Sequence, residues 1–139
     1  MKQEDKDLLL LDLCSRLPYG VKVQTTYINP ESGKRTDIGI DVLTTVEISM
    51  LIDGAEEHKP YLFPLSSMTK EQKREYHQST SKDIDMLQDV ILERINGKDN
   101  TNKHAIAYNG IDWLNTHHFD YRGLIEKGLA IDATGLNIY

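Results

Sequence analysis

The sequence feature that most constrains the fold is a change of hydrophobic period along the chain, from helical to alternating and back to helical. Leu10, Leu13 and Cys14 recur at helical spacing and predict a first helix over residues 2–17. Short alternating segments follow, and helical patterns return in the second half. This order is typical of an α+β fold, in which N-terminal and C-terminal helices pack on a small antiparallel sheet of three to five strands. It also permits a strongly bent or barrel-like sheet.

The predicted sheet occupies residues 21–65. Val21, Val23 and Tyr27 alternate with polar residues, which is typical of a strand. The Asn-Pro-Glu-Ser-Gly run at 29–33 is a strong turn signal. Pro60 and Pro64 stand towards the two ends of the apolar segment 60–65 and favour an edge strand or an extended segment there. The predicted strands are residues 21–28, 36–42, 45–52 and 60–65, with a tight turn at 53–54.

Helix-capping patterns mark the second half of the chain. Thr69 and Gln72 form a capping box before a mostly polar helix over residues 70–78, which is expected to lie on the surface. Thr80 and Asp83 give a similar pattern before a helix over residues 82–95. The polar segment that follows, residues 97–103, is predicted to be a surface loop.

The segment NGIDWLNTHHFDYRGLIEKGLAID, residues 109–132, carries the only tryptophan and two of the five histidines. Asn109 is the predicted N-cap of a helix over residues 110–117, and Asp120 that of a second helix over residues 121–127. Gly128 stands where a helix ends in the left-handed conformation. Two short helices with a tight corner between them are therefore expected.

The run WLNTHHFDYRGLIEKGLAIDA resembles the closing segment of a family of small uncharacterised proteins of gut Bacteroidetes and their phages or mobile elements. The runs KPYLFPLSSMTKEQ and LLLLDLCSRLPYGVKV resemble the same family, and the three runs cover 51 of the 139 residues. The resemblance implies a shared fold and a bacterial or phage origin. It carries no activity and no binding site.

Length and composition predict one soluble domain of 139 residues. The net charge of -6 makes a nucleic-acid surface unfavourable. A single cysteine, Cys14, excludes an internal disulfide and suits a reducing cytoplasm. Cys14 is expected to be a small buried hydrophobic residue rather than a nucleophile. The apolar run near the N-terminus is interrupted by Asp12 and is too short to span a membrane.

No catalytic motif is present, and no metal or cofactor is predicted. The sequence therefore favours a non-enzymatic protein-interaction module with a protein partner. One alternative is a small metal-dependent hydrolase using His117, His118 and Asp120, although adjacent helical residues point about 100° apart and do not readily share one ion. A second alternative is a nucleic-acid-binding small-barrel protein, which the acidic charge disfavours.

The predicted partner-binding surface lies at the corner of the C-terminal segment. Aromatic residues and arginine are enriched at the energetic centres of interfaces, and they cluster only at this corner. In the competing interpretation the aromatic side chains point inward and close the core, with Trp113 mostly buried. The residues of the predicted surface are Trp113, His117, Phe119, Tyr121 and Arg122.

Overall fold

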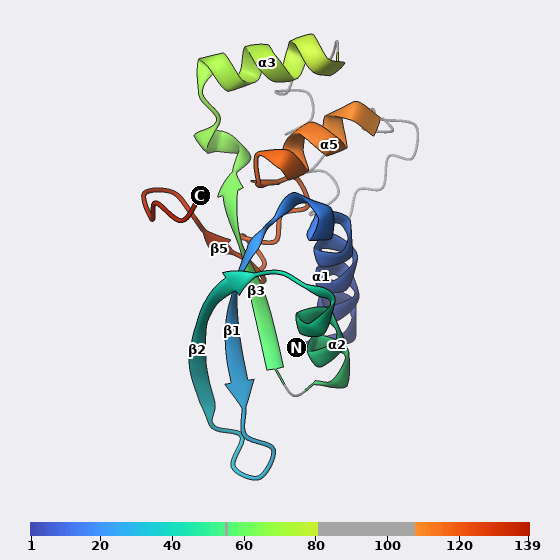
Figure 1. Ribbon diagram of the computed structural model, residues 1–139, viewed down its shortest axis with the longest axis vertical. Coiled ribbons are helices and arrows are strands. Elements are labelled where there is room, and N and C mark those ends of the chain that lie inside the picture. The colour runs from blue at the N-terminus through green and yellow to red at the C-terminus, as the bar shows by residue number, and fades with distance from the viewer. Residues whose placement is uncertain (55, 81–107) are drawn as a thin grey trace.

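The computed structural model describes residues 1–54, 56–80 and 108–139. The fold is α+β, as the order of the hydrophobic patterns predicts (Figure 1). The described residues contain four α-helices and a five-stranded sheet. The helix predicted over residues 82–95 and the loop predicted over residues 97–103 lie outside the described residues.

The sheet is mixed and mostly antiparallel. Its strands follow the order β2-β1-β3-β4, and β5 also pairs with β3. β1 pairs antiparallel with β2 and β3, whereas the two-residue strands β4 and β5 run parallel to β3. The barrel-like alternative is wrong, because the sheet stays open at β2. The strands are β1 (Lys22–Ile28), β2 (Arg35–Val42), β3 (Glu56–Pro64), β4 (Phe119–Asp120) and β5 (Ile131–Asp132).

Strand β3 is the centre of the sheet, which corrects the prediction of an edge strand. Its first five residues pair with β1, and that pairing ends where Val23 lies opposite Pro60. A proline has no backbone N–H to donate, so the ladder with β1 stops there. The remaining residues pair with β4 and β5 instead, so that the C-terminal segment completes the sheet.

Helix α1 (Gln3–Arg16) forms where helical spacing predicts it and continues into the 3-10 turn η1 (Leu17–Tyr19). Its buried residues are Leu9, Asp12, Leu13 and Arg16. Cys14 is exposed, so the prediction that it is buried is wrong. The buried stripe is rotated away from Cys14 because the Asp12–Arg16 ion pair, rather than a fully apolar set, faces the core.

Helix α2 (Thr45–Asp53) occupies residues 45–52, for which the alternating pattern predicts a strand, and that prediction is wrong. Thr44 and Glu47 form a capping box, in which Glu47 accepts the Thr44 backbone N–H at 2.7 Å. Gly54 ends the helix with a positive φ of 76°. The Asp53-Gly54 pair is therefore a helix C-terminus and not a hairpin turn.

Helices α3 (Lys70–Thr80) and α5 (Tyr108–Thr116) lie together at one end of the molecule (Figure 1). The 3-10 turn η2 (Leu65–Ser67) leads from β3 toward α3. The capping box predicted for α3 is confirmed, since Thr69 and Gln72 exchange hydrogen bonds of 2.9 and 3.1 Å. The N-cap predicted for α5 is wrong, because Asn109 is already inside that helix.

The second helix of the C-terminal segment, predicted over residues 121–127, does not form. Gly123 has a φ of 71°, which takes the chain out of the right-handed helical path. A series of turns replaces the helix, and Asp120 caps the start of these turns. Its carboxylate accepts the backbone N–H groups of Leu124 at 3.0 Å and Ile125 at 2.9 Å. Gly128 is left-handed, as predicted.

Two hydrophobic clusters form the core of the described residues. The larger one joins α1, β1, α2 and β3 to residues 124–130. The smaller one joins η2, α3 and α5 to β4 and Tyr121. None of the described helices has the length and apolar character needed to cross a bilayer.

Candidate binding surface on β2 and α2

Strand β2 carries large aliphatic side chains that the rest of the described chain leaves uncovered. Every residue of the strand is exposed. Ile38, Ile40 and Val42 have exposed fractions of 60%, 52% and 43%. Strands usually bury at least one face, so three exposed β-branched aliphatic residues on one strand are unusual.

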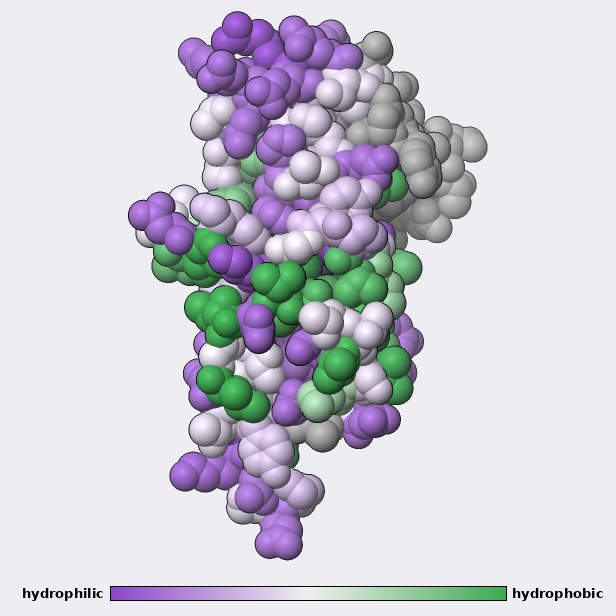
Figure 2. All heavy atoms as spheres, in the orientation of Figure 1, coloured by the Kyte–Doolittle hydropathy of each residue, from purple (hydrophilic) through white to green (hydrophobic). Residues whose placement is uncertain are grey.

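The exposed apolar surface continues from β2 onto the start of α2. Val46 and Met50 stand four residues apart on the same helical face, and both are exposed. Figure 2 shows apolar residues gathered across the middle of the molecule, over the end of β2 and the neighbouring helix. We call this set, Ile38, Ile40, Val42, Val46 and Met50, the β2–α2 surface.

The outer edge of β2 offers backbone hydrogen-bonding groups as well. In the part of the chain that the structure describes, β2 pairs on one side only, with β1. The pairing shifts register between Thr25 and Thr26, which leaves Ile38 as an extra residue between Asp37 and Gly39. This β-bulge bends the strand, and Gly39 takes a φ of 152° there.

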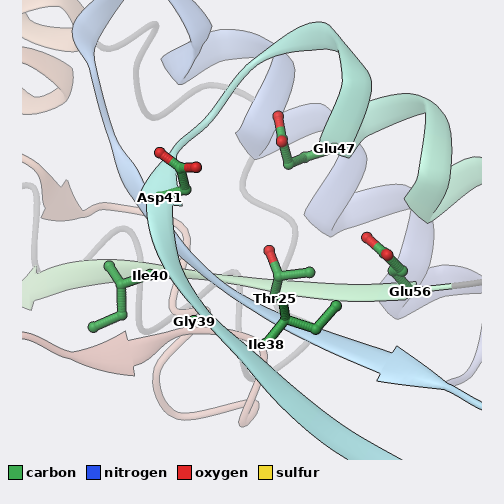
Figure 3. Close-up of a pocket in the computed structure, with 7 residues that line it drawn as sticks. All are labelled: Thr25, Ile38, Gly39, Ile40, Asp41, Glu47 and Glu56. Atoms are coloured by element: carbon green, nitrogen blue, oxygen red, sulfur yellow. The ribbon is translucent and has the colours of Figure 1, made fainter.

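A pocket of about 280 Å³ lies between β2, β1, β3 and α2, beside the β2–α2 surface. Its polar lining is the carboxylates of Asp41, Glu47 and Glu56 and the hydroxyl of Thr25. Figure 3 shows these four side chains around one hollow, each from a different element. Ile38 and Ile40 complete the rim with Gly39.

The fully buried ring of His58 lies beside this pocket. Its Nδ1 atom is 3.0 Å from the Thr25 hydroxyl, and its Nε2 atom is 3.4 Å from a carboxylate oxygen of Glu56. Nε2 has no hydrogen-bond partner among the described residues. Burial lowers the pKa of His58, and the nearby Glu56 and Glu47 raise it in part, so the ring is neutral at pH 7.

Glu47 has two roles, because the same carboxylate caps α2 and lines the pocket. Partial burial raises the pKa of Glu47, but hydrogen bonds from Thr44 and the backbone outweigh that effect and lower it below the ordinary value. Glu47 is therefore ionised at neutral pH and places a fixed negative charge at the pocket.

The predicted partner-binding residues do not form one exposed surface. Phe119 and Tyr121 are buried in the smaller cluster. Arg122 is partly buried, and its guanidinium donates to Asp12 at 3.1 Å and to Ser15 at 3.3 Å. The structure thus places these three side chains in contacts within the chain, and their binding to a partner stays a prediction.

Trp113 and His117 lie at the edge of the same cluster. The two rings stack with their centroids 4.0 Å apart, and the Nδ1 atom of His117 is 2.8 Å from the Trp113 carbonyl oxygen. Trp113 also stacks on Phe119 at 5.8 Å. Trp113 is partly buried against this cluster, so part of its side chain stays accessible to solvent.

The residues of the hydrolase alternative are engaged separately. The ring of His118 stacks on Tyr139 at 3.8 Å, and the carboxylate of Asp120 caps the following turns. Within residues 1–54, 56–80 and 108–139, no group of three or more histidine, cysteine, aspartate or glutamate side chains is arranged to hold a metal ion. The geometry at His117, His118 and Asp120 gives no support to that chemistry.

No protein-family model, curated protein or solved structure matches the chain.

The β2–α2 surface and the acidic pocket are not predicted by the sequence. The alternation of Ile38, Ile40 and Val42 is typical of a strand but does not show that the strand lacks a covering layer. The Thr44–Glu47 capping box is the local signal that could place a helix, and thus Glu47, beside β2. No local signal brings Glu56 and Asp41 to one pocket, because this depends on the registers of β2 and β3 against β1, the strand between them.

Proposed function

We propose that this protein is a non-enzymatic protein-interaction module whose partner binds over the β2–α2 surface. The observation that carries the proposal is an eight-residue edge strand that is exposed throughout and bears three large aliphatic side chains. Exposed apolar groups that lie together mark interaction sites more often than scattered ones do.

The binding mode that fits this surface is addition of an extended segment to the outer edge of β2, which pairs with no other described strand. An added strand gains main-chain hydrogen bonds from the edge and places alternate side chains on each face of the sheet. The aliphatic side chains of β2 and α2 then supply the apolar contacts. The β-bulge at Ile38 limits unspecific pairing, because a bent edge accepts fewer strands than a flat one does.

Nucleic-acid binding and metal-dependent hydrolysis receive less support from the structure. The acidic pocket and the net charge of -6 disfavour binding to nucleic acid. The contacts of His117 and Asp120 disfavour the hydrolase. We infer a cytoplasmic location from the exposed lone thiol of Cys14, which suits a reducing compartment. A bacterial or phage origin stays a prediction.

A photo-crosslinking residue tests the proposed surface directly. It is placed at Ile40 in one variant and at Leu136, which is equally exposed but distant in the chain, in the other. After irradiation in the cells that carry the gene, we expect a discrete crosslinked protein from Ile40 and none from Leu136. The third sample is an affinity-tagged Ile40→Glu variant without the crosslinking residue. It should no longer co-purify the protein that crosslinks to position 40.

Two results would contradict the proposal. Identical crosslinking from both positions would show that no partner prefers the β2–α2 surface. Crosslinking from neither position, with a concentration-independent monomer in light scattering, would show that it binds neither a partner nor a second copy.

A further inference from the structure

The pocket beside β2 gathers negative charge from three parts of the fold. Asp41 belongs to β2, Glu47 to α2 and Glu56 to β3, and all three line the same hollow. In the described part of the chain, no lysine or arginine forms an ion pair with any of the three. The contrast is with the next residue of β3, Glu57, whose carboxylate is held by Arg35 at 2.7 Å on the other face of the sheet.

An unsatisfied buried atom lies beside these carboxylates. The ring of His58 is fully buried and directs Nδ1 at Thr25 and Nε2 at Glu56, both of which line the pocket. Among the described residues, Nε2 has no hydrogen-bond partner. Buried polar atoms are nearly always paired, and Nε2 faces the Glu56 carboxylate at 3.4 Å without a hydrogen bond, so this atom and Glu56 retain hydrogen-bonding capacity next to the pocket.

The size and rim of the pocket restrict what can enter. Its volume of about 280 Å³ lies at the lower limit of pockets for small organic ligands, which span roughly 300–1,000 Å³. It suits one side chain better than a cofactor. Ile38 at the rim can cover an aliphatic stem, while the hydroxyl and carboxylates meet a polar, positively charged end.

We infer that the pocket receives the cationic side chain, arginine or lysine, of the segment that binds along β2. A strand added at the edge of β2 directs alternate side chains to the face of the sheet on which Asp41 and Glu56 lie, so one side chain reaches the hollow. This inference rests on the proposed function and specifies its partner as a protein with a basic residue in an extended, otherwise apolar segment.

The test uses three small probes of similar size that differ in charge. The ¹⁵N-labelled full chain is titrated with N-acetyl-arginine amide, N-acetyl-lysine amide and N-acetyl-citrulline amide, the last being a neutral analogue of arginine. We expect saturable shifts of the Thr25, Glu47 and Glu56 amides with at least one of the cationic probes. The citrulline probe should bind at least about tenfold more weakly, the effect of losing one charged hydrogen bond.

Matched variants show whether the carboxylates are responsible. Glu56→Gln removes a charge from the pocket, and Glu47→Gln does so while keeping a side-chain oxygen to cap α2. Glu57→Gln removes a charge from the same strand on the opposite face. Each pocket variant should weaken the cationic probe by about tenfold with a well-dispersed amide spectrum, and Glu57→Gln should leave it unchanged.

Several outcomes would overturn the inference. One is that the arginine and citrulline probes shift the amide signals equally. Another is that Glu57→Gln and Glu56→Gln weaken binding of the cationic probe equally. A third is that no probe gives a saturable shift. Shifts of the same amides by Mg²⁺ or Ca²⁺ alone, without a response to either organic cation, would assign the pocket to a metal ion instead.

The pocket and the surface can fail separately. If Ile40 crosslinks a partner equally well in wild-type protein and in Glu56→Gln, the proposed function stands and the cationic side chain is excluded. If the cationic probes bind and Ile40 crosslinks nothing, the pocket stands and the proposed interaction surface is excluded.

Discussion

Replacement of Asp12 in α1 should destabilise the protein strongly. The Asp12 carboxylate is fully buried and bridges two cations, Arg16 at 2.7 Å and Arg122 at 3.1 Å. Arg16 is also fully buried, and it donates a second hydrogen bond to the Phe119 carbonyl oxygen at 2.8 Å. Asp12→Ala therefore leaves a buried guanidinium without its carboxylate counter-ion, which costs about 3–5 kcal/mol.

Urea denaturation followed by circular dichroism measures this loss. For a chain of this length the expected change corresponds to a melting temperature lower by about 10–20 °C. Asp7→Ala is the matched control, since Asp7 lies on the exposed side of the same helix and accepts a hydrogen bond from Gln3. That control should change the free energy of unfolding by no more than about 0.5 kcal/mol.

A double variant tests the reason for the effect. In Asp12→Leu/Arg16→Met the buried charges are replaced together by apolar groups of similar volume, which is often neutral or stabilising. We expect the double variant to be more stable than Asp12→Ala by about 2 kcal/mol or more. A double variant no more stable than Asp12→Ala would show that lost packing, and not the unpaired charge of Arg16, causes the damage.

Three further predictions concern other parts of the structure. Thr44→Ala removes the cap of α2 and should lower the free energy of unfolding by about 1 kcal/mol in urea denaturation, and an unchanged value would mean that the cap is dispensable. Trp113→Ala should cost about 3 kcal/mol, and Tyr121→Ala/Arg122→Ala more, in the same assay; a stable double variant would return those residues to the candidates for partner binding. Burial, with a smaller effect of nearby cations, lowers the pKa of His118 from 6.5 to about 4. The unfolded chain therefore binds more protons in that window, so this contribution to stability is complete above pH 6.5 and is lost as the pH falls towards 4. His118→Asn, which tolerates the left-handed φ of 60°, should reduce the loss of melting temperature between pH 7 and pH 4.5, and an unchanged slope would exclude His118 as its source.

The sequence was most informative where one local signal decided an element. Leucine spacing placed α1, and the Thr69–Gln72 capping box placed α3. It failed at α2, because Val46, Ile48 and Met50 alternate like a strand although Thr44 and Glu47 cap a helix. It also misplaced β3, since Pro60 is compatible with a central strand when the ladder on one side ends at that residue.

The candidate site was harder to predict than the fold, because it depends on what is missing around a strand. Alternating aliphatic residues in β2 have the same pattern whether a layer covers them or not. His58 gave no local signal either, since its position beside Thr25 depends on the register of β1 against β3. Register is set across the sheet and not within one strand.

Tyr121 and Arg122, two residues of the predicted partner-binding surface, lie at a junction inside the fold. Two guanidinium groups lie close to the Tyr121 ring, that of Arg16 at 5.0 Å and that of Arg122 at 4.8 Å from its centroid, and both cations converge on Asp12. Aromatic rings and arginine suit an interface because they combine large apolar area with directional polar groups. The same properties suit the joint between α1 and the C-terminal turns, where buried charge must be satisfied within the chain. The aliphatic residues of β2 have no such partner among the described residues. The proposed binding surface is therefore identified by the exposure of its side chains and not by their residue type.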